Sequence, residues 1–275
     1  MNTIRSVLLH LDATLSSAAR LEFARRVALG HEAALSVMVV ASPPQRPVHR
    51  AFSEGPAALQ PPDWSDMDRT KSLFDSALAA GGPQMRWLES SGIDAIDAFS
   101  RQALYADLLL LGQHDPSAAL PGSVPAGFVK SVLIATGKPA LILPFTGEFQ
   151  AVGRDVLIGW NATPQAARAV TAALPWLRGA HRVHVLEAIA EPAQRGTGEL
   201  DIAQYLQFHG IVPVLHRDRV SRADAGDALL SWASDVDADL LVMGCYGHGR
   251  AREFVLGGAS RTVLQTMTLP VLMAH

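Results

Sequence analysis

The sequence repeats itself, and this repetition limits the fold more than any other feature. Four segments of the first half recur in the second half in the same order, displaced by roughly half the chain. The matching pairs are 7–14 (VLLHLDAT) with 156–163 (VLIGWNAT), 94–97 with 224–227, 106–112 (ADLLLLG) with 238–244 (ADLLVMG), and 138–143 with 269–274. We therefore predict two homologous units, residues 1–146 and 152–275, joined near 145–154.

Each unit alternates short apolar strands with segments of helical periodicity. The strand segments are continuous apolar runs, as expected of parallel strands covered by helices on both faces. In the second unit we predict strands near 155–160, 182–188, 212–217, 239–244 and 270–274, and helices near 164–179, 197–209, 223–236 and 258–267. Alternating strands and helices imply right-handed crossovers. The predicted fold is α/β, with one doubly wound, Rossmann-like parallel sheet of five strands in each unit.

Residues 238–275 contain a glycine-rich loop between a strand and a helix. An apolar strand runs into Gly244, Gly247 follows, and the pair Gly257–Gly258 opens the next apolar helix. Glycines let the backbone approach an anion closely, and unpaired N–H groups at a helix start point toward it. In a doubly wound sheet, ligands bind beyond the carboxyl ends of the strands where the winding reverses. Gly244 and Asn161 each stand at the carboxyl end of a predicted strand.

The spacing Gly244-x2-Gly247-x9-Gly257 resembles the nucleotide-binding signature of the universal stress protein family, G-2x-G-9x-G-(S/T). The resemblance covers the whole chain as a tandem pair and is most specific in the second unit. It implies an adenine nucleotide alpha-hydrolase-like sheet with strand order 3-2-1-4-5. In nucleotide-binding members, an acidic residue closing strand 1 contacts adenosine and the glycine loop surrounds the phosphates. Carried over to this chain, the candidate nucleotide-binding residues are Asn161, Met243, Gly244, Tyr246, Gly247, Gly257, Gly258, Ala259 and Ser260.

Two of these positions depart from the family pattern. Asn161 replaces the acidic residue but can still hydrogen-bond a ribose or a base edge. Gly258 replaces Ser or Thr, and a hydroxyl bonded to a charged phosphate is worth roughly 1.5–3 kcal/mol. Ser260 could supply a hydroxyl instead, and Arg250, Arg252 or Arg261 could supply positive charge.

The first unit keeps Asp12 but not the glycine pattern. Asp115 stands where the second glycine would be, and a carboxylate would repel phosphate. Pro116, Pro121 and Pro125 remove backbone donors from the same loop. We therefore interpret residues 1–146 as a degenerate unit retained for packing, in which Asp12 is an ordinary strand-end or capping residue.

Composition limits the other partners. The net charge is −3 with no basic run, which argues against nucleic acid as the main partner. The single cysteine, Cys245, excludes an intrachain disulfide and favours a reducing compartment, and a structural filler is the favoured role for it. No segment approaches the ~20 apolar residues needed to cross a bilayer, and the N-terminus does not read as a signal peptide. Histidines such as His181 and His184 lack metal-ligand spacing. We expect a cytoplasmic protein without a membrane partner or metal site.

Three functions remain open at this point. The first is a non-catalytic regulator of the bacterial stress response that binds ATP or AMP, with Mg²⁺ accompanying ATP, at one competent site in the second unit. The second is a stress-response scaffold or adaptor that binds no nucleotide. The third is a weak ATPase, although no nucleophile elbow, Walker lysine or catalytic residue is found.

The last strand of each unit is an apolar edge that needs cover. The resemblance implies pairing through this fifth strand, so the two units could form an intrachain pseudo-dimer, and two such chains could also associate as a homodimer. A Pro-rich stretch, 43–63, is too long for a simple connection and is interpreted as a solvated insertion, with a lid or docking loop as the alternative.

Overall fold

The computed structural model describes residues 4–41, 65–91, 94–116, 127–188, 200–218, 224–246 and 258–275. The Pro-rich stretch 43–63 and the glycines Gly247 and Gly257 lie outside the described residues. The first half contains β1 (Ser6–Leu11), α1 (Ser17–Gly30), β2 (Ala34–Ala41), α2 (Ser65–Ala79), β3 (Met85–Ser91), α3 (Ala95–Ala103), β4 (Leu108–Gly112), α4 (Phe128–Thr136) and β5 (Ala140–Leu143).

The second half repeats this order of elements. It contains β6 (Asp155–Trp160), α5 (Pro164–Leu177), β7 (Arg182–Ala188), α6 (Ile202–Phe208), β8 (Val214–Asp218), α7 (Ala225–Asp235), β9 (Leu240–Gly244), α8 (Gly258–Thr266) and β10 (Val271–Ala274). All nine elements predicted for this half are present. The largest difference is α6, which begins at Ile202 because Asp201 and Gln204 form a capping box there.

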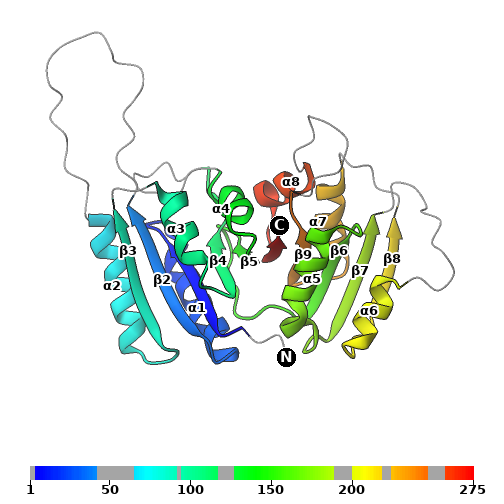
Figure 1. The fold of residues 1–275 in the computed structure, drawn as a ribbon, viewed down its shortest axis with the longest axis horizontal. Helices are drawn as coiled ribbons and strands as arrows, with labels where there is room; N and C mark the ends of the chain where they lie inside the picture. The colour runs from blue at the N-terminus through cyan, green and yellow to red at the C-terminus, as the bar shows by residue number, and fades with distance from the viewer. Residues whose placement is uncertain are drawn as a thin grey trace, which may run out of the picture.

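The strands form one continuous ten-stranded sheet with the order β3-β2-β1-β4-β5-β10-β9-β6-β7-β8 (Figure 1). Each half has the predicted order 3-2-1-4-5, and its strands are parallel. The two halves meet where β5 pairs with β10 in antiparallel fashion, with Leu141 opposite Leu272. The two predicted sheets are therefore joined edge to edge, and the tandem halves form an intrachain pair.

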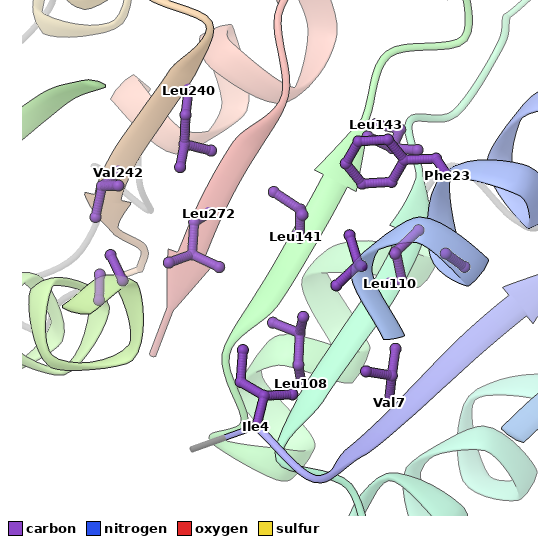
Figure 2. Close-up of a cluster of buried hydrophobic side chains, with 14 of the residues drawn as sticks. Ile4, Val7, Phe23, Leu108, Leu110, Leu141, Leu143, Leu240, Val242 and Leu272 are labelled. Carbon is purple, nitrogen blue, oxygen red and sulfur yellow. The ribbon is translucent and has the colours of Figure 1, made fainter. Parts of the chain in front are cut away.

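The helices cover both faces of this sheet, and each core runs through both halves. On one face α1, α2, α5 and α6 contribute to a core that includes Leu141 and Leu272; Figure 2 shows these two side chains on neighbouring strands. On the other face α3, α4, α7 and α8 cover a second core. Within the described ranges, no helix is long and apolar enough to pass through a membrane.

The repeated Ala-Asp pair before β4 and β9 has a structural role in both halves. Asp107 Oδ2 accepts the backbone N–H groups of Arg5 and Ser6, at 2.9 and 3.0 Å. Asp239 does the same for the backbone leading into β6, accepting from Gly153 at 2.9 Å and Arg154 at 3.0 Å. Each aspartate thus fixes the start of the neighbouring central strand, which explains why the motif occurs twice.

Candidate functional site

The second half places Asn161 and Gly244 at the strand-order reversal, as predicted. β6 and β9 are adjacent and parallel, with Gly159 opposite Met243, so both strands end at the same edge of the sheet. Asn161 is exposed there, and its Oδ1 accepts the Thr163 hydroxyl at 2.8 Å. Thr163 in turn caps α5 by accepting the N–H of Ala166. Asn161 therefore helps to start the helix that flanks the site.

Gly244 is required by the packing of α5. A Cβ atom built on Gly244 would lie 2.4 Å from the backbone nitrogen of Ala166 and 2.7 Å from the carbonyl carbon of Gln165. The first turn of α5 thus sits directly against the end of β9. Met243, one residue earlier, is buried in the core beneath α7 and α8 and can offer a ligand only its backbone.

The loop residues after Gly244 face into the protein. The N–H of Cys245 donates to the carbonyl of Ala274 at 2.9 Å, and the N–H of Tyr246 donates to Ser260 Oγ at 3.4 Å. Tyr246 is buried and has a φ of 50°, in the left-handed region. Its ring lies below Lys130 of α4, with Nζ 5.5 Å from the ring centroid, so it packs against the first half.

These contacts change the roles expected of two predicted residues. Ser260 is buried, and its hydroxyl accepts the N–H of Tyr246. Tyr246 directs its side chain into the junction between the halves. Neither side chain is placed at the exposed strand edge beside Asn161, because the loop turns inward immediately after Gly244.

The start of α8 is the last of the predicted nucleotide-binding groups, and it offers backbone N–H donors. Gly258 and Ala259 are partly exposed, and in the described part of the chain no acceptor contacts their N–H groups. Arg261, in the first turn of the helix, is exposed. Unpaired amides and a cation at a helix start can hold an anion.

The first half fills its own strand-order reversal with an ion pair. Arg20 of α1 and Asp12, which follows β1, are both buried, with Arg20 Nη1 3.4 Å from Asp12 Oδ2. Arg20 also donates to the carbonyl of His10 and to the hydroxyls of Thr14 and Ser16. A Cβ on Gly112, the counterpart of Gly244, would lie 2.5 Å from the Arg20 guanidinium carbon. The guanidinium thus occupies the space between the ends of β1 and β4.

The charges at the strand-order reversal of the first half neutralise each other. Burial alone would raise the pKa of Asp12, but the charges of Arg20 and His10 and the hydroxyls of Ser17 and Thr14 hold that pKa well below its usual range. Burial lowers the pKa of His10 to about 4, although the charge of Asp12 opposes this shift. At neutral pH the site therefore contains a carboxylate, a guanidinium and a neutral imidazole, with its charges paired.

The second half lacks this internal cation. Aligning Asp12 with Asn161 pairs Arg20 with Ala169 and Ser17 with Ala166, and both alanines are buried. The Arg20 contact was missed by the sequence analysis. The signal for it was an arginine on the otherwise apolar face of α1, two turns after Asp12, where the repeat has alanine.

Two further side chains near this site, Cys245 and Trp160, are buried or partly buried. Cys245 is buried, and burial raises the pKa of its thiol to about 12, so the reactive thiolate is disfavoured. Trp160 is partly buried and packs against the core on the α5 face. Both observations fit packing roles.

The fold and the site define a class of protein: two doubly wound α/β halves, each with strand order 3-2-1-4-5, paired through their fifth strands within one chain. The sequence model described as the Universal stress protein family matches residues 154–275. A universal stress protein of Synechocystis sp. is 25% identical over 230 residues, covering 75% of both chains. Residues 154–275 thus match the universal stress protein family, and the similarity to the Synechocystis protein extends into the first half.

Solved structures share the tandem fold. A universal stress protein from Archaeoglobus fulgidus is 17% identical, covers 99% of this chain and 97% of its own, and superposes with a TM-score of 0.70. A protein of unknown function from Pseudomonas aeruginosa is 16% identical, with 98% and 92% coverage and a TM-score of 0.64. A universal stress protein solved in complex with cAMP covers 52% of this chain and 99% of its own, at 19% identity and a TM-score of 0.36.

Proposed function

We propose that this protein is a non-catalytic regulator of the bacterial stress response that binds an adenine nucleotide, ATP or AMP, at a single site in its second half. The observation that carries the proposal is the contrast between the two strand-order reversals. In the first half the guanidinium of Arg20 occupies the strand-order reversal and pairs with the Asp12 carboxylate. In the second half Ala169 stands in its place, Asn161 is exposed, and the N–H groups at the start of α8 meet no acceptor among the described residues.

The roles at the second site follow from this contrast. Asn161 would hydrogen-bond the ribose or the base, and the backbone of Gly244 would line the strand end. The phosphates would lie at the N–H groups of Gly258 and Ala259, with Arg261 as a counter-ion. Gly247 and Gly257 are proposed to complete the loop, and Mg²⁺ would accompany ATP through its phosphate oxygens.

A second function, a scaffold that binds no nucleotide, is favoured by one specific observation. Tyr246 and Ser260 bond to each other and pack toward the first half, so the loop at least partly serves the junction. In this case the glycine-rich loop would stabilise the contact between the two halves, and no ligand would bind at the exposed strand end beside Asn161.

Titration of the purified protein with fluorescent ATP, with and without Mg²⁺, separates the two functions. We expect saturable binding with one nucleotide per chain. Gly258→Asp should abolish it, because a carboxylate at the start of α8 repels phosphate while still favouring the helix. Gly127→Asp places the same charge at the start of α4 in the first half and should leave binding unchanged. Absence of saturation at millimolar nucleotide would favour the scaffold.

A further inference from the structure

The junction between the halves carries two hollows on the face covered by α1 and α5. The first lies between α1 and the linker after β5; it is lined by Ala19, Phe23, Pro144 and Phe149 and is only ≈ 20 Å³ in volume. The second lies between α5 and the strand starts of the first half and has a volume of ≈ 440 Å³. Because the two halves are repeats, these hollows occupy corresponding places beside α1 and α5.

The two hollows differ because Phe149 of the linker and Phe23 of α1 both fill the one beside α1. Phe149 of the linker packs against the core beside α1, and Arg26 Nη1 holds the next residue by donating to the carbonyl of Gln150 at 3.3 Å. The repeat alignment also pairs Phe23 with Ala172. The cleft beside α5 therefore lacks both rings that close the hollow beside α1.

The open cleft combines an apolar floor with cations. Its floor is formed by apolar side chains from both halves: Ile4, Leu108, Pro139, Ala172 and Ala274. Lys138 and Arg168 stand in its lining. Lys138 has no ion-pair partner among the described residues, and Arg168 uses one N–H to donate to the carbonyl of His275 at 2.8 Å.

One carboxylate also lines the cleft. Asp107 Oδ2 already accepts the N–H groups of Arg5 and Ser6 at the start of β1. The lining thus has two cations against one carboxylate that is committed to the backbone. A volume of ≈ 440 Å³ is within the usual range for small-molecule pockets, about 300–1,000 Å³.

We propose that this cleft binds a small amphipathic anion, with an aliphatic or aromatic body on the apolar floor and a carboxylate at Lys138 and Arg168. The ligand contacts both halves, since Lys138 comes from the segment before β5 and Arg168 from α5. The cleft extends along α5 to Ala274, which pairs with Gly244 in the sheet, but none of its lining residues is one of the candidate nucleotide-binding residues, so the site does not depend on the nucleotide proposal.

The probe for this site is 1-anilinonaphthalene-8-sulfonate, an aromatic anion whose fluorescence rises in apolar surroundings. We expect saturable binding of the probe. Ala172→Phe should raise the Kd of the probe by at least about tenfold, because the new ring fills the cleft as Phe23 fills the hollow beside α1. Ala167→Phe, on the exposed side of the same helix turn, is a second filling variant that leaves the core untouched. Phe208→Ser, at the far edge of the sheet, is the matched control and should change nothing.

Displacement by octanoate and by 1-octanol tests the charge. Octanoate should compete more strongly than the alcohol, and Arg168→Gln with Lys138→Gln should weaken octanoate about tenfold while changing octanol less than about twofold. Equal competition by the two, or unchanged probe binding in both filling variants, would overturn the proposal. Gly258→Asp should leave probe binding intact, so a failed nucleotide titration does not decide this site.

Discussion

Arg20 and Asp12 form a buried ion pair, with both side chains only 4% exposed and Nη1 3.4 Å from Oδ2. The pair links the first helix to the end of the first strand and fills the place where a doubly wound sheet usually offers a ligand site. The counterpart residues in the second half, Ala169 and Asn161, are both uncharged. Among the described residues, a buried ion pair at this place is therefore found only in the first half.

Arg20→Met should destabilise the protein by about 3–5 kcal/mol, because it leaves the Asp12 carboxylate buried without its cation. The double variant Asp12→Asn with Arg20→Met should recover a large part of this loss, since no unpaired charge remains. Urea unfolding followed by circular dichroism measures both. A loss below about 1 kcal/mol in the single variant would contradict a buried pair.

His10 should make stability depend on pH in a mildly acidic range. Its pKa is about 4 in the folded protein against an ordinary 6.5, so the unfolded chain takes up a proton first as the pH falls. This contribution is fully present above pH ~6.5 and is lost toward pH ~4, at roughly 1.4 kcal/mol per pH unit. Between pH 6.5 and pH 5 we expect a loss of about 2 kcal/mol from this residue.

The matched variant for this pH effect is His10→Leu, which retains an apolar contact with Phe99 and Phe128. It should flatten the change in unfolding free energy over the same interval, whatever its own stability. Because the pKa of Asp12 is lowered in the folded protein, the contribution of Asp12 to stability is lost only below its ordinary pKa. This loss occurs at a more acidic pH than the interval in which His10 acts. An unaltered pH slope in His10→Leu would rule out His10 as the source.

Gly244→Ala should destabilise the second half by about 1–3 kcal/mol even without any ligand, because the added methyl meets the backbone of α5. Gly30→Ala is the control, since no atom of the described residues lies within 4 Å of a Cβ there and the residue ends α1. That change should be neutral or slightly stabilising. Similar thermal unfolding midpoints for the two variants would contradict the close packing of α5 on β9.

Gly258→Ser restores the hydroxyl that the family signature has at this position. If the second half binds nucleotide, the variant should bind ATP about ten- to a hundredfold more tightly, because a hydroxyl contact to a charged group is worth roughly 1.5–3 kcal/mol. The change should leave the unfolding free energy nearly unaltered, since Gly258 is partly exposed. Calorimetric titration beside the parent protein measures the gain.

Much of the architecture could be predicted because local sequence patterns encode it. The echo of 106–112 by 238–244 predicted the repeat, and the continuous apolar runs predicted parallel strands. The order 3-2-1-4-5 was implied by the family resemblance, and the structure confirms it in both halves. The pairing of the halves was anticipated from the apolar fifth strands, but their fusion into one sheet depends on the antiparallel match of β5 with β10.

The candidate site was harder to predict because it depends on the directions in which individual side chains point. A glycine spacing does not reveal that the chain bends inward after Gly244, so that Tyr246 packs under Lys130 and Ser260 bonds to the loop. Arg20 lies in a helix with otherwise ordinary periodicity, and only the three-dimensional approach of α1 to Gly112 gives it its role. These are long-range contacts, which no local pattern encodes.

The position of β10 has a consequence for how the molecule is assembled. This strand follows all the other described strands in the sequence, yet it lies in the middle of the sheet, bonded to β9 on one side and β5 on the other. A growing polypeptide can complete the first repeat early, but its β5 border stays open until residues 271–274 have emerged. Synthesis of β10 is thus the step that allows the two halves to join into a single sheet.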